Sequence, residues 1–89
     1  MSDTPVDKVR VDAWLWAIRL FKTRSMAADA CQAGHVQVRG DRAKPASQVK
    51  VGDEVRVKGE GRQRIVIVKE LLAKRVSAPL AAQAYEDHS

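Results

Sequence analysis

The sequence contains a single cysteine, Cys31, and only two histidines, His35 and His88, among its 89 residues. One cysteine can form no internal disulfide, which is typical of proteins that stay in a reducing compartment. A lone cysteine and two widely separated histidines also lack the ligand spacing of a zinc site. We therefore expect no metal site and no cofactor.

Long apolar segments are absent as well. No unbroken apolar run in the chain approaches the ~20 residues that span a bilayer. The first eight residues, MSDTPVDK, hold two acids and one base and lack the basic and apolar regions of a secretory signal. We predict that residues 1–8 are disordered, that the protein is cytoplasmic and that it does not bind membranes.

Residue types suited to catalysis are scarce. Besides the cysteine and the two histidines, the pattern forces no pair of carboxylates together. Cys31 falls on the inner stripe of an expected helix, where a free cysteine packs as a small hydrophobe. We predict that the protein is not an enzyme.

Positive charge, in contrast, is abundant and concentrated. The chain carries 16 Lys and Arg against 11 Asp and Glu, a net charge of +5. Residues 19–64 alone hold eleven bases and five acids, whereas the segments on either side are close to neutral. A focused basic surface attracts polyanions, and nucleic acid is the commonest polyanion in a cytoplasm. The alternative is a solvated face that only keeps the protein soluble.

Two helices are expected near the N-terminus. From Val11 onwards, VRVDAWLWAIRLF places apolar residues at the i, i+3, i+4, i+7 spacing of one helical face, with Asp12 as the N-cap. A second helix is expected to begin at Thr23 or Ser25, both capping residues, and to end at Gly34, which tolerates the left-handed conformation.

The remaining chain indicates a small sheet and a third helix. HVQVRG alternates like a strand and leads into the turn residues Gly40 and Asp41, followed by a loop, 41–48. VKVGDEVRVK and RIVIVK read as further strands. A C-terminal helix is expected to start after Ser77 and to run through Tyr85 to a frayed end. The predicted class is α+β: two packed N-terminal helices against a small, mostly antiparallel sheet, with a C-terminal helix.

The start of the second helix is the strongest candidate site. Lys22 and Arg24 bracket Thr23 where free backbone N–H groups and the positive end of the helix dipole favour an anion, so a phosphate fits there. The expected path of the chain brings the Arg39, Arg42 and Lys44 side chains to the same side.

Trp16 and Arg19 are expected on the face of the first helix opposite its apolar stripe, together with Asp12. An exposed Trp beside arginines can stack on an unpaired base or a sugar. The alternative is that Trp16 covers the edge of the core against the C-terminal helix. Two other functions stay open: a protein-interaction adaptor that uses this face, and a DNA-binding helix-turn-helix, although the second helix has no run of residues suited to base edges.

Four motifs, in this order, carry a resemblance to a known family: RVDAWL, KTRSMA, AGHVQVRGDRAKPA and VGDEVRV. From Arg10 to Val57 they resemble the S-four RNA-binding domain, also called the alpha-L motif. Over nearly the whole chain, WLWAIRLFKTR, RAKPA, RIVIVK and SAPLAAQAYED are similar to the fifteen-kilodalton ribosome-associated heat-shock protein family. The resemblance implies an S-four domain over residues 9–69, with residues 70–89 as a C-terminal helix and tail.

This resemblance implies a function and a set of contacts. It implies binding to ribosomal RNA of the large subunit, and to tRNA bearing a nascent chain, in rescue or quality control of stalled complexes. We expect no DNA binding, and a monomer. The predicted RNA-binding residues, from the resemblance, the charge and the helix start together, are Arg10, Trp16, Arg19, Lys22, Thr23, Arg24, Ser25, Arg39, Gly40, Arg42 and Lys44.

Overall fold

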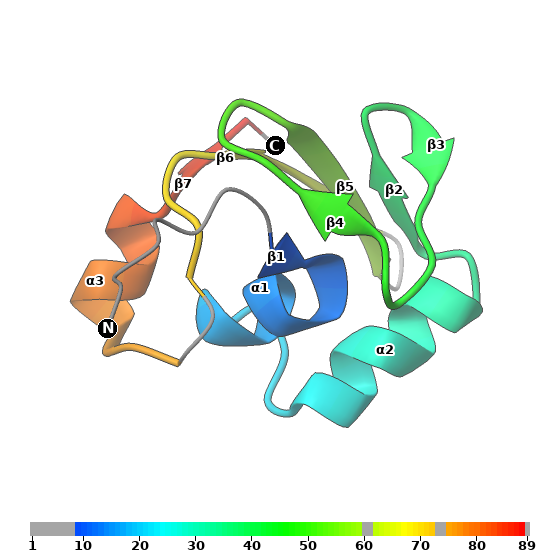
Figure 1. Ribbon diagram of the computed structural model, residues 1–89, viewed down its shortest axis with the longest axis horizontal. Helices are drawn as coiled ribbons and strands as arrows, with labels where there is room; N and C mark the ends of the chain where they lie inside the picture. Colours follow the sequence, from blue (N-terminus) through cyan, green and yellow to red (C-terminus); the bar gives the residue numbers. More distant parts are fainter. Residues whose placement is uncertain (1–8, 60–61, 73–74, 89) are drawn as a thin grey trace, which may run out of the picture.

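The computed structural model describes residues 9–59, 62–72 and 75–88. Over this part of the chain, three helices pack with two antiparallel sheets (Figure 1). The predicted α+β class and the N-terminal helix pair are therefore confirmed. In chain order the elements are β1 Val9–Arg10, α1 Val11–Ala17, α2 Arg24–Gln32, β2 Val36–Val38, β3 Asp41–Arg42, β4 Gln48–Val49, β5 Glu54–Gly59, β6 Arg62–Val68, α3 Ala78–Gln83 and β7 Tyr85–Asp87.

The larger sheet has five strands in the order β3-β2-β5-β6-β7, and the short strands β1 and β4 form a separate pair. Alternate residues point to one face of the sheet, so that Val36, Val55 and Val66 are completely buried. In the view of Figure 1 the helices lie below this sheet. The hydrophobic core therefore sits between the sheet and the helices.

Helix α1 supplies the large side chains of the core, and α2 supplies small ones. Trp14 and Leu15 of α1 are fully buried, and they share the core with Ala27 and Cys31 of α2. Small side chains allow two helices to approach closely. The predicted position of Cys31 on the inner face of the second helix is thus confirmed.

Helix α1 is shorter than the periodicity predicted, because Arg19 ends it. Arg19 has φ +67, and its backbone N–H bonds to the Trp16 carbonyl while the Leu20 N–H bonds to the Leu15 carbonyl. This pair of bonds is a Schellman motif, in which glycine is the usual left-handed residue. An arginine in the sequence does not indicate the end of a helix as a glycine would. The apolar spacing therefore predicted a helix that continues to Phe21.

Helix α2 begins and ends as predicted. The Thr23 hydroxyl accepts a 3.1 Å hydrogen bond from the Met26 N–H, which makes Thr23 the N-cap. At the other end Gly34 has φ +84, and the His35 N–H bonds to the Ala30 carbonyl. Both signals are local, which is why the sequence contains them.

The turn after β2 is shifted by one residue from its predicted position. Its central residues are Arg39 and Gly40, with φ +54 and φ +85, and Asp41 already pairs with Val38 as the first residue of β3. Two positive φ angles in a two-residue hairpin loop define a type I′ turn. The segment predicted as a loop, 41–48, therefore begins and ends in short strands.

The C-terminal helix is also shorter than predicted. Helix α3 follows Ser77 and ends at Gln83, and Tyr85–Asp87 then forms β7 along β6. The His88 N–H continues this pairing with a 2.7 Å bond to the Ile65 carbonyl. The backbone of β6 is a long-range partner that the local sequence of residues 84–88 does not indicate. Pairing with β6 replaces the predicted helical end. The predicted disorder of residues 1–8 lies outside the described residues.

Candidate nucleic-acid interface

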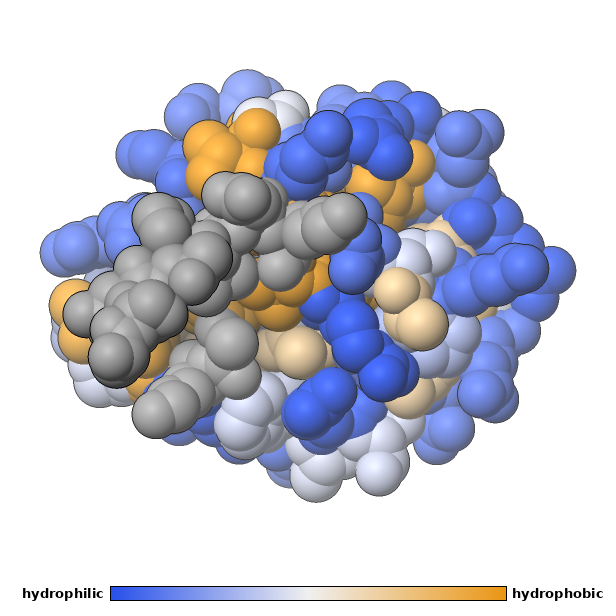
Figure 2. All heavy atoms as spheres, in the orientation of Figure 1, coloured by the Kyte–Doolittle hydropathy of each residue, from blue (hydrophilic) through white to orange (hydrophobic). Residues whose placement is uncertain are grey.

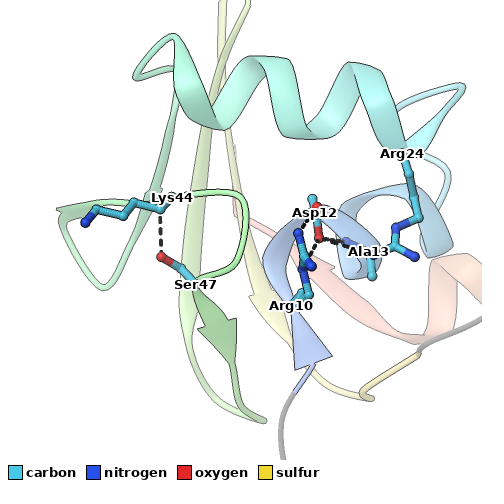
Figure 3. A network of polar contacts seen from close by, with 6 residues as sticks. All are labelled: Arg10, Asp12, Ala13, Arg24, Lys44 and Ser47. Atoms are coloured by element: carbon cyan, nitrogen blue, oxygen red, sulfur yellow. Dashed lines mark hydrogen bonds and ion pairs between the residues drawn. The ribbon is translucent and has the colours of Figure 1, made fainter.

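Asp12 forms the centre of a polar cluster where α1 and α2 begin. Its side chain is almost completely buried and accepts hydrogen bonds from Arg10, at 3.2 Å from Nε and 3.0 Å from Nη2. Oδ1 also accepts a 2.7 Å bond from the Ala13 N–H and lies 3.8 Å from Nη2 of Arg24. Asp12 is therefore neither the helix cap nor exposed, and both predictions for it were wrong. We call Arg10, Asp12 and Arg24 the helix-start cluster (Figure 3).

The helix-start cluster holds two cations around one anion and keeps both cations accessible. The side chains of Arg10 and Arg24 are 50% and 49% exposed, whereas that of Asp12 is 5% exposed. Each guanidinium has five N–H donors and uses only part of them on the carboxylate. The cluster therefore presents oriented, positively charged donors to solvent, which is the arrangement that binds a phosphate.

The other predicted residues at the start of α2 surround this cluster. Lys22, Thr23 and Ser25 are all exposed. The Thr23 hydroxyl is engaged by the Met26 N–H, and the Lys22 carbonyl accepts a 2.8 Å bond from Arg75. Lys22 thus lies just before the first turn of α2 and Ser25 within it, where backbone N–H groups and the helix dipole also favour an anion.

The cations that follow β2 lie at the opposite end of α2, which corrects the expectation of one common site. Arg42 donates a 2.7 Å bond from Nη2 to the carbonyl of Gln32, the last residue of α2. Arg24 is the first residue, and nine residues of helix rise roughly 12 Å between the two. In Figure 3 the Lys44 side chain likewise extends away from the helix-start cluster.

A hollow lies beside these later cations. It has a volume of about 470 Å³, and we call it the loop hollow. A second hollow of about 210 Å³ shares Arg42 and Ala43 with it and is also lined by Arg39 and Ser47. Figure 2 shows hydrophilic side chains over the side of the molecule that carries β2 and β3. The loop hollow is lined by Cys31, Gln32, Arg42, Ala43, Lys44 and Pro45. Neither hollow is predictable from the sequence: the walls of the loop hollow join α2 to β3 and the loop after it, and those of the second hollow come from the β2–β3 hairpin, the same loop and β4.

Neither Trp16 nor Arg19 lines the two hollows. Trp16 is half-buried, so it is neither a fully exposed stacking platform nor a core residue. Arg19 is exposed and donates a 3.2 Å bond from Nη1 to the Val76 carbonyl. Arg19 thereby connects the end of α1 to the segment before α3, and its contact with RNA stays a prediction.

Two non-glycine residues in the described chain have positive φ angles, and both are predicted RNA contacts: Arg19 at +67 and Arg39 at +54. The left-handed conformation costs an ordinary L-residue roughly 1–2 kcal/mol, and such strain is concentrated at functional sites. Arg39 also reaches the buried carboxylate of Asp53, at 3.4 Å. Strain at Arg39 therefore favours a functional role for its charge.

Replacing Arg39 with Asn is expected to stabilise the fold and weaken binding to RNA. Asn tolerates the left-handed conformation at a type I′ turn, so the free energy of unfolding should rise by about 0.5–1 kcal/mol. Arg39 is 57% exposed in its ion pair with Asp53, so the loss of that pair subtracts little. Urea denaturation measures the gain, and Arg56→Asn, the same replacement within strand β5, should give none. An unchanged or lower stability of Arg39→Asn would contradict strain at this turn.

Cys31 has the environment of a packing residue. It is buried, and burial together with the nearby Asp12 carboxylate raises the pKa of its thiol to about 11. The thiol therefore stays protonated near neutral pH and is a poor nucleophile.

Within the described ranges, no group of three or more His, Cys, Asp or Glu side chains could hold a metal ion. In the same part of the chain, no helix has the length and apolar character needed to cross a membrane.

Comparison with known proteins identifies a matching family and similar relatives. The S4 domain family matches residues 9–55. Heat shock protein 15 homolog of Aeromonas salmonicida is 44% identical over 80 residues, covering 90% of this chain and 61% of that protein. The RQC P-site tRNA stabilizing factor of Bacillus subtilis is 36% identical over 63 residues, covering 71% of this chain and 73% of the factor.

A solved structure is also similar to this chain. The trimeric structure of Vibrio cholerae heat shock protein 15 superposes with a TM-score of 0.86 at 35% identity, covering 93% of this chain and 84% of that one. The chain spans about three fifths of the length of the Aeromonas relative, at 61%. The monomer expected for this chain stays a prediction.

Proposed function

The chain belongs to the S4 domain family and is similar to heat shock protein 15, and from this premise we propose that it binds structured RNA on the large ribosomal subunit through phosphate contacts. The ligands proposed are ribosomal RNA and tRNA that carries a nascent chain, in the rescue or quality control of stalled complexes. The relatives named for stabilizing a P-site tRNA support the second ligand. A cytoplasmic location and the absence of enzyme activity are part of the same proposal.

The helix-start cluster is the observation that carries this proposal. A buried carboxylate hydrogen-bonds to Arg10 and attracts Arg24 at 3.8 Å, so two half-exposed cations are held beside the first turn of α2 before a phosphate arrives. Side chains cannot easily read the deep major groove of A-form RNA, and recognition therefore rests on backbone and shape. Arg42 and Lys44, near the other end of α2, add a second group of cations.

The double variant Arg24→Ala/Lys44→Ala tests the proposal by removing one cation from each end of α2. In lysate fractionated on a low-salt sucrose gradient, wild-type protein should follow the free large subunit, and the variant should stay at the top. Roughly five phosphate contacts predict a slope of about −3.5 to −4.5 for log affinity against log salt, and the variant should flatten it.

Lys69→Ala/Lys74→Ala is the matched control, since it removes the same charge elsewhere. Lys69 is exposed just after β6, and Lys74 lies outside the described residues. The control should sediment and bind like the wild type. If binding of the wild-type protein to RNA does not depend on salt, the proposed phosphate contacts are wrong. If both double variants lose the same affinity, net charge alone governs binding and the positions of the cations do not matter.

A further inference from the structure

The guanidinium of Arg42 lies flat against the backbone at Gly34. A Cβ atom built on Gly34 would stand 3.3 Å from Nε, 3.5 Å from Cζ and 3.7 Å from Nη2 of Arg42. The central carbon is as close as the outer nitrogens, so the group approaches Gly34 with its face and not with its edge. A side chain at residue 34 would therefore press on this group.

A hydrogen bond fixes the orientation of the same group. Nη2 of Arg42 donates to the Gln32 carbonyl at 2.7 Å, at the end of α2 where carbonyls lack a helical partner. Arg42 is nevertheless exposed. One face of a planar cation is thus covered by Gly34, and the opposite face is left for another partner.

Arg42 also lines both hollows. The loop hollow, of about 470 Å³, has apolar walls at Ala43 and Pro45 and a second cation at Lys44. This volume falls within the range of about 300–1,000 Å³ that is common for ligand sites. The smaller hollow, which Arg42 also lines, has polar groups in its wall, among them Arg39 and Ser47. An apolar space next to a polar, positively charged one matches a base attached to its sugar and phosphate.

We propose that the loop hollow binds one unpaired nucleotide of the RNA, with the base stacked on the free face of the Arg42 guanidinium. This inference rests on the proposed function and adds to it, because a clamp on phosphates alone needs neither an apolar hollow nor a flat, fixed arginine. Unstacked bases in loops and bulges are the part of RNA that proteins stack on arginine planes. Arg39 and Lys44 then meet the phosphates on either side of that nucleotide.

Three RNA hairpins test the inference with the full chain: one with a single bulged adenine analogue that fluoresces, one with an abasic bulge, and one that is fully paired. The wild-type protein should bind the first about tenfold more tightly than the other two, the size expected for one stacked base. Its fluorescence should change on binding. Because the abasic and paired hairpins are compared on the unaltered protein, this result does not depend on how any variant folds.

Arg42→Lys retains the charge and removes the planar face. This variant should bind all three hairpins equally, with the affinity of the wild type for the paired one. Arg56→Lys, the same replacement on strand β5, should retain the preference for the bulged base. A wild-type protein that binds the three hairpins equally, or an Arg42→Lys protein that keeps the preference, overturns the stacked base but leaves RNA binding in place. Failure of the wild type to bind any hairpin at low salt overturns the proposed function as well.

Discussion

Asp12→Asn should weaken RNA binding about tenfold, although it removes a negative charge from a chain whose net charge is already +5. The reason is that the carboxylate orients Arg10 and Arg24 and keeps the two guanidiniums close to each other. An amide cannot neutralise either cation, so the arginines repel each other and sample other rotamers. A tenfold decrease is the size expected when one charge-assisted hydrogen bond to phosphate no longer forms.

The direction of the change in RNA affinity shows whether binding depends on the orientation of the arginines or on net charge alone. If only net charge governed affinity, every acid-to-amide replacement would strengthen binding. Asp29→Asn is the matched control, because Asp29 is an exposed carboxylate on α2. It should leave binding unchanged or slightly stronger. Salt titrations of the three proteins with the same RNA measure the difference, and an Asp12→Asn protein that binds as tightly as Asp29→Asn would refute the orienting role.

A double-mutant cycle between Asp12 and Arg24 localises the effect further. Arg24→Ala should weaken RNA binding by the wild-type protein, but it should weaken binding by the Asp12→Asn protein much less, since Arg24 is already poorly oriented there. The stability of Asp12→Asn should fall by about 1–2 kcal/mol, because its buried amide leaves the arginines without a counter-ion. Equal losses of affinity from Arg24→Ala in both backgrounds would mean that the two residues act independently.

What the sequence predicted correctly depends on neighbours along the chain. The Thr23 cap and the Gly34 end of α2 each require only a hydrogen bond to a residue a few positions away. The alternation of valines in β2 and β5 likewise reflects one buried face of a sheet. Such features are local, so propensity and spacing are sufficient to find them.

What the sequence did not predict depends on contacts between distant segments. The burial of Asp12 follows from Arg24, which arrives on another helix, and strand β7 exists because β6 is there to pair with it. The walls of the loop hollow join α2 to the loop after β3. Charge and the resemblance together predict which cations contact RNA, and that contact stays a prediction. The division of these cations between the two ends of α2 was not predictable from the sequence.

Trp14→Ala is expected to give the largest loss of stability, about 3–5 kcal/mol. Trp14 is completely buried, and its indole N–H donates a 2.9 Å bond to the Glu70 carbonyl. The Lys69 and Glu70 N–H groups in turn bond to the Ala84 carbonyl. The Trp14 side chain therefore fills the core beneath α1, and its hydrogen bond connects α1 to the segment between β6 and β7.

Trp14→Phe separates these two roles. Phe retains most of the apolar volume and removes the N–H donor, so it should cost only about 1–2 kcal/mol. For 89 residues, a free energy of unfolding of roughly 4–13 kcal/mol is ordinary. The Phe variant should therefore fold, whereas the Ala variant should be marginal. Urea denaturation followed through Trp16, the tryptophan that remains, measures both.

The ratio of the two losses tells which role of Trp14 dominates. A loss in Trp14→Phe close to that in Trp14→Ala would mean that the bond to Glu70 holds the C-terminal segment and that volume is secondary. In that case hydrogen exchange should accelerate most, relative to the wild type, at the amides of Lys69 and Glu70, whose partner is Ala84. A small loss in both variants would contradict the view that α1 and the C-terminal segment share one core, since a cavity of that size cannot form there without cost.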